Sequence, residues 1–450
     1  MVAFVVAAAT SAAVWLVLAF GRGSFWRARP RLPRSPVPAR WPSVAVVVPA
    51  RDEASLLPLT LPGLLAQRYA GDARVVLVDD QSSDGTAAVA RAIAEAHAGG
   101  NPLPLVVAGT RPTPPGWAGK LWALQEGLEQ VGDVDMVLFT DADIAHPPDS
   151  LARLVAAAEE GGWDQVSLMA RLDVTDAWDR LLIPSFVYFF AMLYPFRWVA
   201  RRPLRRRTPP SPRRAAAAGG CLLVRRAALA AAGGIAVVRG AVIDDVSLAR
   251  ALARAGGRLW LGYGEDVRSV RRYDGLGPLW AMVTRSAYVQ LRCSPVALAG
   301  TVAGLLLVFA VPPVAALVGV GLGWSVVAAL GAGTWALMAA TAVPMERHHG
   351  LRRWRALTLP VAALVYLAMT VDSARRHHRG EGAAWKGRTY GPEASLEAGH
   401  RSRRRPTRTT IPGSGDPNSA AGSSSRGGRR RQDTDAPTGP PGPDHAAVRP

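Results

Sequence analysis

Two aspartates, Asp141 and Asp143, stand one residue apart in the stretch LFTDADIAHPPDS, residues 138–150. The apolar residues 136–139 just before them have the composition of a buried strand. Two carboxylates at the end of such a strand repel each other and resist burial, so a compensating partner is expected. A divalent cation, Mg²⁺ or Mn²⁺, is one such partner, because both ions accept carboxylate ligands. The alternative is an Asx turn that closes the strand before the prolines.

The chain around this stretch alternates between predicted strands and helices. Residues 43–50, 73–80 and 134–141 are short apolar runs, and the first two are rich in β-branched residues. Residues 86–98, TAAVARAIAEAHA, have the composition of a helix. This alternation is typical of an α/β domain with a mostly parallel sheet.

Three of the predicted strands end in acidic residues. The acids are Asp52 and Glu53, Asp79 and Asp80, and Asp141 and Asp143. Parallel sheets bind their ligands beyond the C-terminal ends of the strands, so these pairs are expected to converge. A functional site is therefore predicted at this edge of the sheet.

Long apolar segments flank the α/β region. Residues 2–20 carry no charge and are followed at once by arginines, which favours an uncleaved membrane anchor over a signal peptide. Residues 295–320 and 322–344 are each long enough to span a bilayer. Residues 356–371 are shorter, and they predict either a short span or an interfacial helix.

A further apolar segment, residues 181–200, interrupts the α/β region. A single crossing there would place Asp143, before the segment, and Asp245, after it, on opposite sides of the membrane. The two acids could then not act on one substrate, so an interfacial position is predicted for the segment. The next stretch, 201–214, has seven arginines and no acid. It suits either anionic lipid headgroups or a solvated loop.

Composition sets the remaining bounds. The 450 residues carry a net charge of +19 and are 49% hydrophobic, and the two cysteines suggest no disulfide framework. Nucleic acid is not expected as a partner, because no binding fold accompanies the arginines. The predicted organisation follows: an anchor at 1–21, an α/β domain at 41–292 with an interfacial segment and basic loop at 181–214, membrane helices at 295–372, and a disordered tail at 391–450.

Five motifs occur in the order found in family 2 glycosyltransferases. They are VVVPARDE, VLVDDQSSDGT, GKLWALQEG, FTDADI and AVIDDVSLARAL, within residues 43–292. The chain therefore resembles this family, whose fold is of the GT-A type, a Rossmann-like nucleotide-binding half with a mostly parallel sheet. GWAGKLWAL and RSAYVQLRCSP, together with the terminal apolar segments, resemble the membrane-bound branch associated with hopanoid biosynthesis.

The resemblance implies a role for each matching residue. Nucleotide-sugar binding, with a UDP-sugar as first choice, is implied for Pro49, Glu53, Asp79, Asp80, Lys120 and Asp141. Asp143 is implied as the direct ligand of Mg²⁺ or Mn²⁺, with Asp141 beside it. Asp245 is implied as the catalytic base and Asp244 as its partner, although the family usually has Glu at the first position. The acceptor side is implied for Gly219, Gly220, Arg285, Gln290 and Arg292.

One departure from the family narrows the expected activity. Processive polysaccharide synthases carry Gln-x-x-Arg-Trp after the base, and TRSAYVQLRCSP has no Trp after its arginine. This favours inverting transfer of one sugar to a membrane lipid, possibly a hopanoid. The alternatives are a polyprenyl-phosphate sugar transferase and a catalytically silent relative that binds nucleotide or lipid. Basic loops predict a multi-pass protein of the cell membrane whose α/β domain is cytoplasmic.

Overall fold

The computed structural model describes residues 1–390 apart from 34–35, 101, 201–210, 382 and 386–387. The described residues fall within one compact unit, residues 1–403. The predicted disordered tail and most of the predicted basic loop therefore lie outside the described residues.

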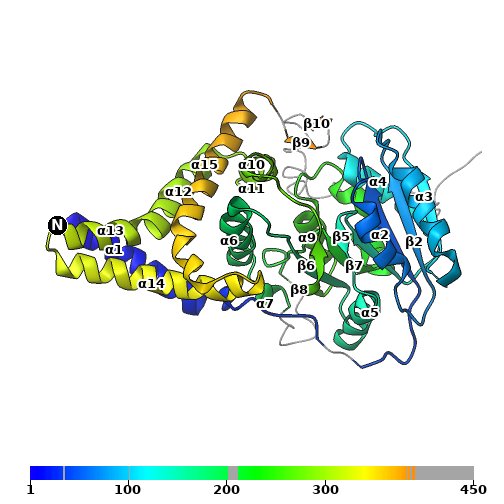
Figure 1. Cartoon of the computed structure of the whole chain (residues 1–450), viewed down its shortest axis with the longest axis horizontal. Helices are drawn as coiled ribbons and strands as arrows, with labels where there is room; N and C mark the ends of the chain where they lie inside the picture. Colours follow the sequence, from blue (N-terminus) through cyan, green and yellow to red (C-terminus); the bar gives the residue numbers. More distant parts are fainter. Residues whose placement is uncertain (34–35, 101, 201–210, 382, 386–387, 391–450) are drawn as a thin grey trace, which may run out of the picture. The chain divides into compact units, whose positions relative to one another are not determined.

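An eight-stranded sheet organises the α/β region, in the order β3-β2-β1-β4-β7-β6-β8-β5 (Figure 1). Its strands are β1 Val44–Ala50, β2 Ala73–Asp79, β3 Leu105–Gly109, β4 Met136–Thr140, β5 Ile144–Ala145, β6 Gln165–Arg171, β7 Cys221–Arg225 and β8 Leu259–Ser269. Strands β3, β2, β1 and β4 are parallel, and so are β6 and β8, whereas β7 and β5 run antiparallel to their neighbours. The predicted GT-A-type, mostly parallel α/β fold is confirmed.

Helices cover both faces of this sheet, which explains why the strands are continuous apolar runs. Alternate residues of β1 point to opposite faces: Val44, Val46 and Val48 join one core, and Ala45 and Val47 join the other. The first core is covered by α2 Leu57–Leu65, α3 Thr86–His97 and α5 Ser150–Gly161. The second is covered by α4 Gly119–Gln130, α8 Arg226–Ala231 and α9 Asp244–Arg254.

Five helices in the described part of the chain are long and apolar enough to cross a membrane. They are Val2–Gly21, Ala177–Val199, Pro295–Gly321, Ser325–His348 and Arg353–His378. The first contains α1 Val2–Leu16, the second α6 Ala177–Leu193 and α7 Phe196–Val199, and the third α12 Pro295–Leu305 and α13 Val311–Gly321. A short turn separates α13 from α14 Ser325–His348, and α1 runs beside both helices (Figure 1).

Helix α6 is held by hydrogen bonds to two of the other apolar helices. The Tyr188 hydroxyl lies 2.7 Å from the Thr341 hydroxyl of α14. The hydroxyl of Tyr366, in α15 Leu359–His378, donates to the Leu182 carbonyl over 2.8 Å. Helix α15 has 20 residues, because it continues past the apolar stretch 356–371 into a charged end. Its length therefore gives no argument against crossing.

Two short helices connect the sheet region to α15. They are α10 Leu276–Thr284 and α11 Ala287–Gln290. The Trp280 indole donates to Asp372 over 2.8 Å, and the Tyr288 backbone N–H donates to the Ser373 hydroxyl over 3.0 Å. These contacts place the α10–α11 segment, which follows β8, against an apolar helix.

Candidate active site

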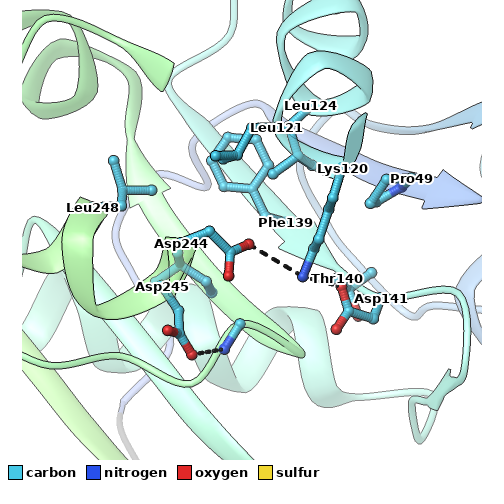
Figure 2. Close-up of a pocket in the computed structure, with 12 residues that line it drawn as sticks. Pro49, Lys120, Leu121, Leu124, Phe139, Thr140, Asp141, Asp244, Asp245 and Leu248 are labelled. Carbon is cyan, nitrogen blue, oxygen red and sulfur yellow. Dashed lines mark hydrogen bonds and ion pairs between the residues drawn. The ribbon is translucent and has the colours of Figure 1, made fainter. Parts of the chain in front are cut away.

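A small pocket of about 20 Å³ lies where the C-terminal ends of β1 and β4 meet the starts of α4 and α9 (Figure 2). Six residues predicted from the sequence line it: Pro49, Lys120, Asp141, Gly219, Asp244 and Asp245. The apolar side chains of Leu121, Phe139 and Leu248 form part of its wall. The folded chain thus brings together candidates for the donor side and for catalysis that are spread over residues 49–245 of the sequence.

Lys120 forms ion pairs with two acids of the site, Asp141 after β4 and Asp244 at the start of α9. Its ammonium lies 2.7 Å from an Asp141 carboxylate oxygen and 3.3 Å from an Asp244 carboxylate oxygen. Burial alone would lower the pKa of Lys120, but the charges of Asp141 and Asp244 outweigh it, so the net pKa is raised. The lysine therefore stays charged and holds the two carboxylates on opposite sides of one cation (Figure 2).

Asp245 lies in the first turn of α9, where a helix favours negative charge. Its carboxylate accepts a hydrogen bond from the Gly219 backbone N–H over 3.0 Å and another from the Val246 N–H over 2.7 Å. Burial, followed by the neighbouring Asp244 charge, raises the pKa of Asp245 to about 7. A carboxylate with such a pKa is suited to accept a proton near neutral pH.

Asp143 points to a different partner, Arg271, which follows β8. The Arg271 Nε lies 3.2 Å from the Asp143 carboxylate, and its terminal nitrogen lies 2.6 Å from the Glu53 carboxylate. The Ser269 hydroxyl donates to the same Asp143 oxygen over 2.8 Å. One guanidinium therefore bridges the acids that end β1 and β4.

Each of the two predicted metal ligands forms an ion pair with a basic side chain, Asp141 with Lys120 and Asp143 with Arg271. Among the residues that the structure describes, no three acidic, histidine or cysteine side chains form a cluster able to hold a metal ion. Mg²⁺ and Mn²⁺ sites often use one or two carboxylates, with substrate phosphates and water as the other ligands. Asp143 and Asp141 could supply such a pair of carboxylates only if their ion pairs with Arg271 and Lys120 were broken.

The acids after β2 are engaged in the loops that follow the strands. Asp80 is fully buried; its carboxylate accepts from the Thr110 hydroxyl over 3.1 Å and lies 3.8 Å from Arg51. Asp79 accepts from the Ser82 backbone N–H over 3.1 Å. Both acids therefore shape the loop beside the pocket in this conformation.

The residues predicted for the acceptor side do not lie together: only Gly219 lines the pocket. The Gly220 carbonyl accepts from the Thr140 hydroxyl over 2.8 Å. Arg285, which follows α10, acts electrostatically on Tyr273. Gln290 donates to the Tyr194 hydroxyl over 2.5 Å, next to α6. Arg292 has a positive φ of 56° and does not line the pocket.

Arg271, Ser269 and Tyr273 are site residues that the sequence reasoning missed. Burial is the main cause of the raised pKa of Tyr273, and the Asp143 charge adds to it. The sequence signal that could have found them was the stretch SVRRYDG, residues 269–275. Its two arginines lie at the end of a strand, as the predicted acids do.

Comparison with known proteins adds three findings. Residues 42–287, more than half of the chain, match the family model described as "Glycosyltransferase like family 2". Undecaprenyl-phosphate 4-deoxy-4-formamido-L-arabinose transferases from Serratia proteamaculans and Proteus mirabilis are 34% and 32% identical over 139 residues. These matches cover 30% of this chain and 39% of the length of each relative. A mannosyltransferase from Pyrobaculum calidifontis, solved with GDP-Man and Mn²⁺, aligns over 81% of this chain and 98% of its own, with 22% identity and a TM-score of 0.47.

Proposed function

This chain belongs to the glycosyltransferase-like family 2, and we propose that it transfers one sugar from a nucleotide sugar to a lipid of the membrane in which its apolar helices lie. The meeting of Lys120, Asp141 and Asp245 in one pocket supports this proposal most strongly. A fixed cation there can balance the negative charge that develops on a departing nucleoside diphosphate. A UDP-sugar is the first donor to test, because the sequence motifs resemble UDP-sugar-using members.

The acids near the ends of β1 and β2 are proposed to hold the nucleoside. Glu53 is buried and already accepts from Arg271, which fixes its carboxylate direction. A carboxylate so fixed can accept a hydrogen bond from the uracil ring or a ribose hydroxyl. Asp79 is proposed for the same role, and Asp80, being fully buried, positions the loop that carries Thr110.

A divalent cation is proposed as the cofactor, with Asp143 and Asp141 as its protein ligands. When bound, such a cation would neutralise charge on the diphosphate. For Asp143 to bind a cation, its side chain must move away from Arg271, because the guanidinium now contacts one oxygen of the Asp143 carboxylate. Arg271 is therefore expected to compete with the cation for Asp143.

The variant Arg271→Gln tests this competition. Without the guanidinium, Asp143 is free to bind a cation, while the glutamine amide can still donate to Glu53. We expect the nucleotide-free variant to bind Mn²⁺ roughly tenfold more tightly than the wild type, which corresponds to about 1.4 kcal/mol. Electron paramagnetic resonance of free Mn²⁺ measures this affinity without any enzyme assay.

Arg272→Gln is the matched control, because Arg272 is exposed and its ion pair with the half-exposed Asp173 is loose, at 3.8 Å. It should leave the Mn²⁺ affinity unchanged. Equal affinities for the wild type and Arg271→Gln would show that the guanidinium does not compete. Absence of Mn²⁺ binding in both proteins, even with UDP present, would instead reject the cofactor.

The proposed reaction is a single displacement with inversion. The acceptor oxygen forms a bond to the anomeric carbon as the bond from that carbon to the diphosphate oxygen breaks. The proton of an acceptor hydroxyl passes to Asp245, whose carboxylate the Gly219 N–H holds at 3.0 Å. Asp244 is fixed by Lys120 at 3.3 Å and is therefore less available as a base.

The base favours a lipid with a hydroxyl group, and a hopanoid is the specific candidate that the sequence resemblance suggests. A second candidate acceptor is a polyprenyl phosphate, which the names of the curated relatives favour. A phosphate is already ionised at neutral pH and needs no base. The two acceptors therefore differ in how strongly they should depend on Asp245.

Product chemistry separates these candidates. Purified chain is incubated with radiolabelled nucleotide sugars and extracted membrane lipids, and the organic phase is treated with mild acid. A sugar on a phosphate is released under conditions that leave a glycoside of an alcohol intact. Acid-stable label supports the hydroxyl acceptor, acid-labile label supports the polyprenyl phosphate, and no lipid label with any nucleotide sugar contradicts the proposed function.

The proposed orientation places the sheet region in the cytoplasm, where nucleotide sugars are made. Basic residues follow the first apolar helix and are frequent in residues 346–355, at the end of α14 and in the loop after it, and positive loops stay on the cytoplasmic side. A reporter fused after residue 290 should be active only as a cytoplasmic reporter. An exported signal there would overturn the arrangement, and a second fusion at residue 385 determines whether α15 crosses the membrane.

A further inference from the structure

A second hollow, of about 360 Å³, lies where β5, β6 and β8 meet at the edge of the sheet. It shares no lining residue with the pocket around Lys120. Its lining includes Ala145, His146, Arg171, Glu265, Asp266 and Arg268. A water molecule occupies about 30 Å³ in the liquid, so this hollow can hold a polyatomic ligand.

The strand register places two arginines of this hollow side by side. Arg171 of β6 is the Cα partner of Arg268 of β8, and Arg268 in turn is the Cα partner of Ala145 of β5. The β6–β8 register shifts between Met169 and Arg171, so the common direction of the two arginines rests on their shared lining of the hollow. The small side chain of Ala145 leaves space beside the two guanidinium groups. Like charges on such positions repel each other, which costs stability unless an anion lies between them.

The acids that line the hollow form their ion pairs with arginines other than Arg171 and Arg268. Glu265 forms its ion pair with Arg31, and Asp266 lies 3.5 Å from Arg153. Arg171 and Arg268 form no side-chain hydrogen bond or ion pair with any residue in the described ranges. Within the described residues, the hollow therefore holds two guanidinium groups with no direct ion pair, of which Arg171 is partly buried and Arg268 is exposed.

The hollow lies near the end of a candidate membrane helix. His349 directly follows α14; burial is the main cause of its pKa of about 4, and the Arg171 charge also lowers this pKa. The His349 Nε2 is buried without a hydrogen-bond partner among the described residues. The Tyr263 ring of β8 lies 5.4 Å from the ring of His348, the last residue of α14. Arg171 thus borders the region where lipid headgroups would meet the protein.

We propose that this hollow binds a phosphate group between Arg171 and Arg268. The planar guanidinium matches phosphate oxygens with paired hydrogen bonds, and a phosphate monoester carries close to the two charges left unpaired. The phosphate can belong to a lipid headgroup, such as phosphatidic acid, or be free in solution. The site is independent of the proposed transfer reaction.

The test uses the full chain in nanodiscs of phosphatidylcholine, with or without phosphatidic acid, at constant ionic strength. Binding of inorganic phosphate is measured by calorimetry, and the thermal midpoint Tm is compared between the two lipid compositions. We expect the wild type to bind phosphate or to gain Tm with phosphatidic acid. The double variant Arg171→Gln/Arg268→Gln should bind at least about tenfold more weakly, because each guanidinium donates charge-assisted hydrogen bonds.

The single variants report on folding. Arg171→Gln and Arg268→Gln each remove one of two repelling charges, so the anion-free Tm of each should be unchanged or higher than that of the wild type. Weaker anion binding by these variants is then not explained by unfolding. Arg91→Gln, an exposed arginine of α3, is the control and should respond as the wild type does. A response to phosphatidic acid alone identifies a lipid site, and a response to inorganic phosphate alone identifies a free-phosphate site. Equal responses of the wild type and the double variant to every anion would overturn the proposal.

Discussion

Replacing Asp245 with asparagine is expected to lower the transfer rate by about 10²- to 10⁴-fold while donor binding is retained. Asparagine keeps an oxygen that can accept from the Gly219 N–H, now at 3.0 Å, so the loop beside α9 should stay in place. What it loses is the ability to take the acceptor's proton. Such a loss amounts to about 3–5 kcal/mol of transition-state stabilisation. Single-turnover kinetics measure the transfer rate, and calorimetry with UDP measures the retained donor-site affinity.

The pH dependence gives this prediction a second readout. Because the pKa of Asp245 is raised to about 7, the wild-type rate should fall as the pH drops below about 7, where the carboxyl is protonated. The asparagine variant should lose that dependence. For the same reason, folded stability should decrease as the pH rises through about 7, since the buried carboxyl then becomes charged.

Asp72→Asn is the matched control, because Asp72 is exposed and lies just before β2, at the end of the strand away from the candidate site. It should transfer sugar at the wild-type rate. Transfer by Asp245→Asn within a few-fold of the wild type would show that Asp245 is not the base. Asp244 would then be the candidate, or the acceptor would be a phosphate that needs none.

Replacing Asp143 with alanine should abolish both transfer and metal-dependent nucleotide binding. The expected reason is loss of the carboxylate that would hold the cation against the diphosphate, an interaction made most strongly in the transition state. Arg271 keeps its contact with Glu53 at 2.6 Å, so the site should not collapse. Calorimetry with UDP and Mn²⁺ and a thermal melt of the same sample separate a binding defect from unfolding.

Asp173→Ala controls for the loss of an acidic side chain, because Asp173 is half-exposed and its ion-pair partner is the exposed Arg272 at 3.8 Å. Its UDP affinity with Mn²⁺ should equal that of the wild type. An unchanged UDP and Mn²⁺ affinity in Asp143→Ala would remove Asp143 from the proposed metal site.

The parallel half of the fold was predictable because its signals are local. The runs 43–50, 73–80 and 134–141 became β1, β2 and β4 within a few residues, since apolar β-branched runs buried on both faces leave a clear pattern. The order of β5 to β8 was not predictable. Strand β5 has only two residues, and β7 lies inside the sheet with residues 221–224 all buried, so neither carries an alternation signal.

The acidic half of the site was likewise predictable, because strands that run parallel bring their ends to one edge. The cationic half was not, because its contacts join distant residues. Arg271 meets Glu53 across 218 positions of sequence, and nothing near either residue indicates the other. The length of α15 was underestimated for a similar reason: its charged last turn continues a helix that the apolar pattern alone ends at 371.

The most direct test of the account measures nucleoside diphosphate released by the purified chain from each nucleotide sugar, with Mn²⁺, in the presence and absence of extracted membrane lipids. A glycosyltransferase that acts on a lipid should release nucleoside diphosphate from at least one donor, with lipid raising the rate and labelled sugar entering the organic phase in equal amount. Asp245→Asn should show neither, while Asp72→Asn should show both. Release that is the same with and without lipid, or no release from any donor, would contradict the account.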